Sequence, residues 1–341
     1  MEVAVHQPFA QQFVELSDSS HTGEARRLAL HCAERSGLSE TERGGIAIAV
    51  TELATNILKH AGSGTILCES VGQNGNAGLR VLALDKGPGI ADLSRALEDG
   101  YSTSGTAGNG LGAVQRLSTQ FDVYTLAQRG TCVLAEFWSK RKAPDLGLPF
   151  QVGAVSLAMR RESVCGDGWR SRPSNGTSLF MVVDGLGHGP LASDAAREAE
   201  RVLDETGSIS PATILQDCHD ALRKTRGAAA AIAAISLEKK LVFFAGVGNI
   251  SGTLINLNSR RGMTSHNGTV GHQLHKIQEF SFPWEPESVL IMHSDGLGSK
   301  WDLEQYPGIM RKPASVIAGV LYRDFERQRD DVTVLVAKNL E

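Results

Sequence analysis

Apolar residues recur at helical spacing in two stretches near the start of the chain. One stretch runs from Gly23 to Arg35 and the other from Glu42 to His60. Ser39 stands where the second helix would need an N-cap residue. The pattern therefore predicts two helices joined by a short turn.

Shorter apolar runs follow, and they are typical of strands. TILCESV (65–71) and LRVLALD (79–85) are rich in β-formers and are separated by QNGNAG, in which Asn-Gly favours a hairpin turn. A glycine-rich loop (102–112) leads into a helix expected at 111–120, and FDVYTLA and GTCVLAEFW predict two more strands. We expect residues 1–140 to form one α/β domain.

The segment 141–150 is predicted to be a linker. The stretch around it, SKRKAPDLGLP, is polar, contains two prolines and shows no periodicity. Beyond it the pattern restarts, with helices expected at 192–206 and 211–224. The predicted strands are VGAVSLAMR, SLFMVVD, AAIAAISLE, LVFFAGVG, VLIMHSD and VTVLVAK. Residues 151–341 are therefore expected to form a second domain.

Composition narrows the class of protein. A length of 341 residues suits two domains, and a net charge of −4 gives no general attraction to nucleic acid or to an anionic membrane. The 5 cysteines form no C-x-x-C pair, which indicates neither a disulfide framework nor a zinc site. No secretory signal or membrane-spanning stretch is visible, so we expect a cytoplasmic protein without nucleic-acid or membrane partners.

Three motifs in the first domain suggest a nucleotide pocket. Glu52 and Asn56 are four residues apart on a predicted helix, so a carboxylate and an amide oxygen share one face. The carboxylate could accept a hydroxyl proton, and the amide oxygen could bind Mg²⁺. DKGPGI (85–90) follows a strand, and backbone amides of GNGLG (108–112) could approach phosphate oxygens at a helix start. Each motif alone is more often a solvated helix face or a turn, but their order favours a nucleotide site.

With TELATNILKHAG and LEDGYSTSGTAGNGLGAVQRL, the first 140 residues resemble the GHKL ATP-binding family, and within it the switch serine kinases. The resemblance implies a Bergerat-type α/β sandwich that binds ATP and Mg²⁺. It also implies that Glu52 is the general base, Asn56 the Mg²⁺ ligand and Asp85 the acceptor for the adenine amino group. Further implied nucleotide contacts are Gly87, Gly89, Gly108, Gly110, Leu111, Gly112 and Thr131.

Aspartates stand at strand ends or turns of the second half: Asp167, Asp184, Asp295 and the pair Asp330 and Asp331. Asp-Gly is a favoured turn dipeptide, and from the dipeptides alone hairpin loops are an equal alternative. Their position after the apolar runs FMVV and VLIMHS favours convergence at one sheet edge, where divalent cations would neutralise them. Two such cations can bind a phosphate and activate a water molecule.

This half resembles the SpoIIE-type branch of the protein phosphatase 2C class. The resemblance implies an α-β-β-α sandwich with two Mn²⁺ or Mg²⁺ ions. Asp167 and the Gly185 carbonyl would bind the first ion, and Asp295 and Asp330 would bind the second. Asp184 would bind both ions. Asp330 is preferred to Asp331 because it aligns with the family's Asp-x-x-Thr-Val pattern. The sequence departs from eukaryotic members of the class in two ways. Those members have an acidic pair at the first metal-binding position, where this chain has only Asp167, and they have an arginine for the substrate phosphate, which cannot be assigned here.

We therefore expect a bifunctional regulator that phosphorylates and dephosphorylates Ser or Thr on a STAS-domain partner, within a network that regulates a sigma factor. In an alternative, the first domain is an ATP-dependent module that sequesters a partner. A third possibility is that the phosphatase acts on the protein's own phosphorylated residues.

Overall fold

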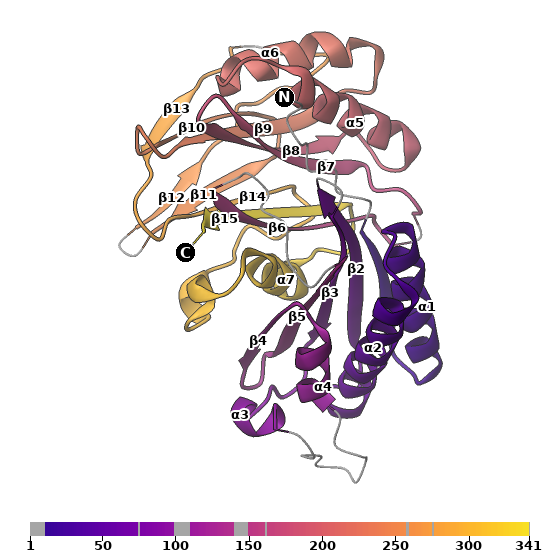
Figure 1. Cartoon of the computed structure of the whole chain (residues 1–341). Helices are drawn as coiled ribbons and strands as arrows, with labels where there is room; N and C mark the ends of the chain where they lie inside the picture. Colours follow the sequence, from indigo (N-terminus) through magenta and orange to yellow (C-terminus); the bar gives the residue numbers. More distant parts are fainter. Residues whose placement is uncertain are drawn as a thin grey trace. The chain divides into compact units, whose positions relative to one another are not determined.

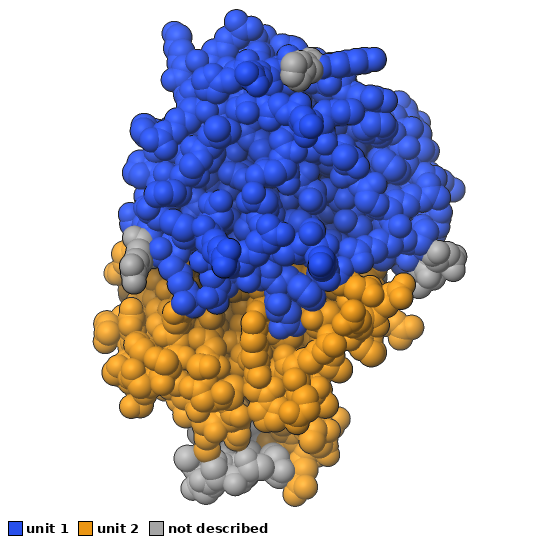
Figure 2. Space-filling model, turned by 180° about the vertical axis from the view of Figure 1, so that it is seen from behind, with its two compact units in different colours: residues 1–6, 146–301, 324–341 blue, residues 7–145, 302–323 orange. Residues whose placement is uncertain are grey.

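The computed structural model describes residues 11–73, 76–98, 110–139, 149–160, 162–256, 259–274 and 276–340. Two compact units are present and are coloured separately in Figure 2. Unit 2 combines residues 7–145 with 302–323, and unit 1 contains the remainder. The sequence assigned all of 151–341 to one domain, whereas the structure groups 302–323 with the N-terminal half.

Unit 2 contains a five-stranded antiparallel sheet in the order β1-β2-β3-β5-β4. Helices α1 and α2 lie along one face of this sheet, as Figure 1 shows. The strands are β1 (Gln12–Leu16), β2 (Gly64–Gln73), β3 (Asn76–Asp85), β4 (Gln120–Leu126) and β5 (Gly130–Trp138). The helices are α1 (Ser20–Arg35), α2 (Glu40–His60), α3 (Leu93–Ala96) and α4 (Gly110–Leu117).

A capping box fixes the start of α2. The Glu42 backbone N–H donates to Ser39 Oγ over 3.3 Å, and the Ser39 backbone N–H donates to Glu42 Oε2 over 2.7 Å. These bonds satisfy two amides that have no partner within the helix. The predicted N-cap is confirmed. From there α2 buries Ile46, Val50 and Leu53 against the sheet.

The other face of this sheet is covered by helix α7 (Ala314–Phe325). The Cys132 thiol points to the Val316 carbonyl at 3.9 Å. A β-carbon placed on Gly319 would lie 3.3 Å from both Cys132 Sγ and a Leu84 methyl group. Every residue of β5 is buried, as expected for a strand packed on both faces.

Unit 1 is built around two five-stranded sheets, ordered β13-β10-β9-β8-β7 and β12-β11-β14-β15-β6. Helices α5 (Pro190–Glu205) and α6 (Pro211–Ala221) cover the outer face of the first sheet (Figure 1). The strands of the first sheet are β7 (Asp167–Ser174), β8 (Thr177–Gly185), β9 (Ala228–Ser236), β10 (Leu241–Val247) and β13 (Phe280–Pro283). Those of the second are β6 (Phe150–Leu157), β11 (Ser251–Ile255), β12 (Arg260–Met263), β14 (Val289–His293) and β15 (Val332–Asn339).

Two apolar cores hold unit 1 together. Large aromatic residues fill the space between the sheets, where Phe150 makes edge contacts with Phe180 at 5.6 Å and with Trp284 at 5.5 Å between ring centroids. A second core, which includes Leu203 and Ile214, lies between the first sheet and α5 and α6. Among the described helices, none combines the length and apolarity that a membrane crossing requires.

Candidate active sites

Asp85 closes strand β3 and is held by two backbone amides. Its Oδ1 accepts hydrogen bonds from the N–H groups of Gly87 at 2.8 Å and Thr131 at 3.3 Å. Burial raises the pKa of Asp85, while these bonds and the positive charges of Arg323 and His60 oppose the shift. The carboxylate is therefore fixed in one orientation at the sheet end.

The glycines after Asp85 are required by close packing. A β-carbon on Gly87 would lie 2.6 Å from the Ala61 β-carbon, and one on Gly89 would lie 2.7 Å from the Leu126 carbonyl oxygen. Gly89 also has a φ of 78°, which side chains disfavour. Both glycines thus let the turn that follows Asp85 pack closely against its neighbours.

Glu52 and Asn56 lie on α2, and both are half-buried. Helical spacing places them on the same face as His60, which is close enough to Asp85 to influence the pKa of that carboxyl group. This face therefore runs toward the Asp85 end of the sheet. Their predicted roles as base and Mg²⁺ ligand remain predictions.

Helix α4, which begins at Gly110 and includes Leu111 and Gly112, packs beside α2. A β-carbon on Gly45 of α2 would lie 3.3 Å from a Leu117 methyl group of α4. The predicted lid residue Gly108 lies outside the described residues.

The second candidate site lies at one end of β7 and β8. Asp167 and Asp184 are direct partners in the antiparallel register of these strands. The Asn249 amide donates to Asp184 Oδ2 at 3.2 Å and to Asp295 Oδ2 at 2.8 Å. Asp295 follows β14 in the other sheet, so carboxylates from both sheets of unit 1 meet here.

These carboxylates are held in an unfavourable environment. Burial raises the pKa of Asp184 to about 7, and the neighbouring Asp295 adds to the shift. Burial and the Asp184 charge also raise the pKa of Asp167 well above its usual value. Asp167 Oδ2 is buried and has no hydrogen-bond partner in the described structure. An oxygen-binding cation would relieve both the repulsion and the missing partner.

The donor set is open rather than closed. Among the described residues, no three His, Cys, Asp or Glu side chains form a ready-made cage for a metal ion. Mg²⁺ usually keeps several waters and needs only one or two carboxylates from a protein.

The two adjacent aspartates of the last motif have different environments. Asp331 is buried, and its two oxygens accept the backbone N–H groups of Met159 and Gly166, each at 2.6 Å. Asp330 is exposed. The pKa of Asp184 is raised mainly by burial and by Asp295, and the charge of Asp330 adds a smaller contribution. Asp331 therefore anchors the segment before Asp167. Asp330 is the exposed member of the pair, and its Oδ1 accepts the Asp331 N–H at 2.9 Å.

Gly185 could not carry a side chain. Its N–H donates to the Gly166 carbonyl at 3.1 Å, and a β-carbon would collide with the Ala192 backbone of α5. The chain can therefore pass closely beneath α5 immediately after Asp184.

Two family models match this chain. The histidine kinase-like ATPase domain matches residues 16–137, and stage II sporulation protein E (SpoIIE) matches residues 174–339. The serine/threonine-protein kinase RsbT of Bacillus subtilis (strain 168) is 41% identical over 114 residues, which are 33% of this chain and 86% of RsbT. The chain belongs to the histidine kinase-like ATPase family through its first domain, and its second domain contains the match to SpoIIE.

The SpoIIE domain has further relatives. The phosphoserine phosphatase RsbX of the same organism is 26% identical over 194 residues, which are 55% of this chain and 94% of RsbX. A solved structure described under "The bacterial stressosome: a modular system that has been adapted to control secondary messenger signaling" is 28% identical, with a TM-score of 0.52. It covers 55% of this chain and 99% of its own. The fold of the SpoIIE domain is thus that of the protein phosphatase 2C class, as expected from the sequence.

The sequence did not indicate Asn249 as part of the SpoIIE domain site. It did identify Asp331, but not that Asp331 anchors the backbone before Asp167. The signal for Asn249 was weak, because GVGN resembles an ordinary turn after a buried strand. The model of the SpoIIE family begins at residue 174, so Asp167 lies before the match. Its candidacy depends on its pairing opposite Asp184.

Proposed function

We propose that this protein phosphorylates and dephosphorylates Ser or Thr residues of a STAS-domain partner in a bacterial partner-switching pathway. Support comes from similarity to a protein named as a serine/threonine kinase in one half and to one named as a phosphoserine phosphatase in the other. The structural observation that carries the phosphatase half is the meeting of Asp184 and Asp295 through the Asn249 amide, with Asp167 opposite Asp184.

In the kinase half, Asp85 is the proposed acceptor for the adenine amino group. Its amide bonds leave one carboxylate oxygen available, since both bonds go to Oδ1. Asn56 would contribute its amide oxygen to Mg²⁺ on the ATP phosphates. Glu52, one turn earlier on α2, would accept the proton of the attacking hydroxyl group.

In the phosphatase half, bound divalent cations would supply charge neutralisation and an activated water molecule. Asp167, Asp184 and the Gly185 carbonyl would hold one cation, and Asp184, Asp295 and Asp330 would hold the other. Asn249 would keep the Asp184 and Asp295 carboxylates in register, and Asp331 would hold the segment before Asp167.

The two halves are tested by separate variants. Glu52→Ala should abolish transfer of labelled phosphate from ATP to a STAS-domain protein and leave its release unchanged. Asp184→Ala should do the reverse. Glu40→Ala, an exposed residue in the first turn of α2, and Asp220→Ala, an exposed residue of α6, are the matched controls.

The assignment is wrong if neither Glu52→Ala nor Asp184→Ala changes either rate. A stable stoichiometric complex with the partner, formed with ATP and without phosphate transfer, would instead identify the first domain as a sequestering module.

A further inference from the structure

The loop that precedes β9 lies directly against the loop that follows Asp184. In the register of β8 and β9, Asp184 pairs with Ala229 and Gly185 with Ala228. The pairing continues past the strands, because the Leu186 N–H donates to the Gly227 carbonyl at 3.0 Å. The next position brings Arg226 opposite Gly187.

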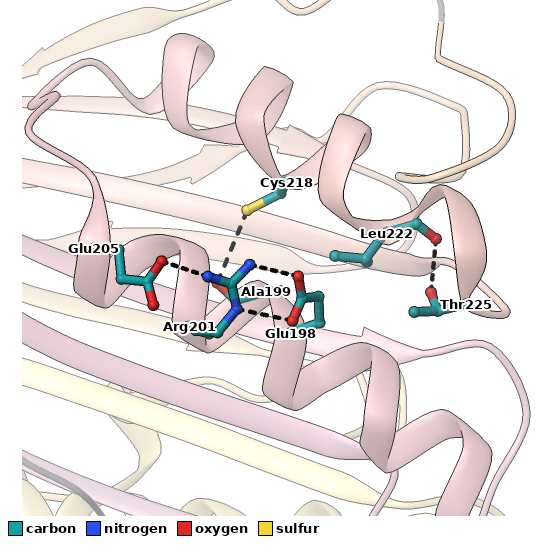
Figure 3. Close-up of polar contacts among 7 residues, drawn as sticks. All are labelled: Glu198, Ala199, Arg201, Glu205, Cys218, Leu222 and Thr225. Carbon is teal, nitrogen blue, oxygen red and sulfur yellow. Dashed lines mark hydrogen bonds and ion pairs between the residues drawn. The ribbon is translucent and has the colours of Figure 1, made fainter.

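Local hydrogen bonds hold the loop before β9 in place. The Thr225 hydroxyl donates to the Leu222 carbonyl at 2.8 Å, a contact drawn in Figure 3. The Gly227 N–H in turn donates to Thr225 Oγ1 at 3.0 Å, and Gly227 has a φ of 77°, which favours glycine. Arg226 stands between these two residues, so its backbone position is fixed relative to the Asp184 loop.

The Arg226 side chain is exposed and makes no hydrogen bond or ion pair in the part of the chain that the structure describes. Its guanidinium lies over Gly187, where a β-carbon would be 3.1 Å from Nη1. Other arginines nearby are engaged: Arg223 pairs with Asp220 at 3.1 Å. Arg201 is held by Glu198 and Glu205 on α5 (Figure 3). Arg226 therefore presents exposed N–H donors next to the loop that follows Asp184.

Two large apolar side chains flank the same loop. Leu186 is 45% exposed and Leu191, in the first turn of α5, is 54% exposed. Both side chains belong to the short segment that follows Asp184, where exposed apolar groups could contact a bound protein segment. Leu186 is adjacent in sequence to Gly187, the residue that Arg226 covers.

We propose that Arg226 binds the phosphate of a phosphoserine or phosphothreonine substrate, and that Leu186 and Leu191 contact apolar residues next to the phosphorylated position. This inference rests on the proposed phosphatase activity and names its substrate class, a phosphorylated protein segment with apolar flanking residues. A guanidinium offers paired N–H donors that match phosphate oxygens. Arg226 would thus be the arginine that contacts the substrate phosphate, a residue that could not be identified from the sequence alone.

The test measures steady-state kinetics with three defined substrates and saturating Mn²⁺. The substrates are p-nitrophenyl phosphate and two phosphoserine nonapeptides, one with leucine and valine beside the phosphoserine and one with glutamates. Inhibition by inorganic phosphate provides a readout of phosphate affinity that does not depend on the peptide. Arg226→Ala, Arg226→Lys and the double variant Leu186→Ser, Leu191→Ser are compared with two controls. These are Arg223→Ala, which changes a neighbouring exposed arginine, and Leu237→Ser, which changes an exposed leucine after β9.

Arg226→Ala should raise KM for all three substrates and the inhibition constant of phosphate by about 10- to 100-fold, with kcat little changed. Arg226→Lys should recover part of this loss, because a lysine keeps the charge but not the paired donors. The double leucine variant should raise KM only for the apolar peptide. The two control variants should behave like the unmodified protein.

Unchanged KM and phosphate inhibition in Arg226→Ala, in a protein whose activity Asp184→Ala abolishes, would overturn the inference and leave the phosphatase intact. Equal KM values for the two peptides would refute the apolar contact. Absence of hydrolysis by the unmodified protein with Mn²⁺ and with Mg²⁺ would refute both the inference and the proposed phosphatase.

Discussion

The Lys312 ammonium group lies 2.8 Å from the Asp122 carboxylate, although 190 positions separate these residues in the sequence. Two further contacts join the same regions: Arg129 donates to Gln305 at 3.2 Å, and the Tyr124 hydroxyl donates to the Pro307 carbonyl at 3.4 Å. The segment 302–323 is thus an integral part of the unit that contains the ATPase-family sheet.

Both ends of this segment return to one place in the SpoIIE domain. The Gly298 N–H donates to the Phe325 carbonyl at 2.8 Å, and the Arg327 N–H donates to the Gly296 carbonyl at 2.9 Å. Asp295 precedes this paired stretch by one residue and Asp330 follows it by three. The chain therefore leaves and re-enters the SpoIIE domain beside the candidate metal ligands.

Packing at Gly319 gives the first prediction. Gly319→Leu should destabilise unit 2 by roughly 1–3 kcal/mol, because the side chain would have to enter the space between Cys132 and Leu84. Denaturant unfolding of the full chain measures this loss. The control is Gly44→Leu, since Gly44 is an exposed helical glycine whose β-carbon would meet nothing within 4 Å. A Gly319→Leu protein as stable as Gly44→Leu would contradict the packing.

Some elements were predictable because local pattern and tertiary role agree. The helix expected at 42–60 is α2, and its capping box could be read directly from Ser39 and Glu42. The strands around QNGNAG were found because apolar runs flank a favoured turn.

Other elements depend on distant partners and were missed. Strand β7 has the polar sequence DGWRSRPS, which resembles a loop. Its Arg170 is buried only because Asp204 of α5 binds it at 2.7 Å, and Arg172 donates to the Leu203 carbonyl at 2.6 Å. Helix α7 is buried along almost its whole length, so it lacks the amphipathic period that would indicate a surface helix.

The candidate sites were also predictable only in part. Aspartates after apolar strands could be selected because strand ends meet at a sheet edge. The contacts of Asn249 and Asp331 join loops from the two sheets, and the contact of Arg226 with Gly187 joins the ends of the paired strands β8 and β9. No local motif in the sequence indicates them.

A buried charge cluster in the ATPase-family domain gives the second prediction. Arg80 binds Glu136 at 2.6 Å and Glu69 at 3.0 Å, and all three side chains are buried. Arg80→Met should destabilise the domain by about 3–5 kcal/mol, because both carboxylates would lose their cation. Denaturant unfolding at neutral pH measures the loss.

Acid pH provides an internal check on Arg80→Met. Burial already raises the pKa of Glu69, so removing the cation should raise it further. Protonation then removes the unpaired charge, and the stability deficit should shrink as pH falls toward 5. Adding Glu69→Gln and Glu136→Gln should recover part of the stability, and a deficit that survives both changes would argue against the charge explanation.

Charge repulsion at the SpoIIE domain site gives the third prediction. Asp184 lies near Asp295, Asp330 and Asp331, all of which raise its pKa. Without divalent cations, Asp184→Asn should be as stable as the unmodified protein or more stable, because a neutral side chain relieves the repulsion. With Mn²⁺ the order should reverse, since only the unmodified protein gains stability from binding. Thermal unfolding in EDTA and in Mn²⁺ separates these states, and an equal Mn²⁺ shift in both proteins would count against Asp184 as a ligand.

The last prediction concerns Glu200 of α5. Burial raises the pKa of its carboxyl group from 4.5 to about 7. The nearby Asp204 adds to the shift and the Arg170 charge opposes it. The folded state therefore holds a proton that the unfolded state releases between these pKa values. The protonated Glu200 carboxyl group therefore contributes to the free energy of unfolding. This contribution is fully present below pH 4.5 and declines as the pH rises toward 7, by an amount on the order of 3 kcal/mol.

Glu200→Gln should remove this dependence, because an amide remains neutral throughout. The difference in unfolding free energy between Glu200→Gln and the unmodified protein should therefore grow in favour of the variant from pH 5 to pH 8. Measuring both proteins at one fixed Mn²⁺ concentration keeps the metal-site aspartates constant in the comparison. Glu205→Gln, which changes an exposed neighbour on the same helix with 62% of its side chain accessible, is the matched control. A difference for Glu200→Gln that stays flat from pH 5 to pH 8 would mean that Glu200 is already ionised in the folded protein at pH 5.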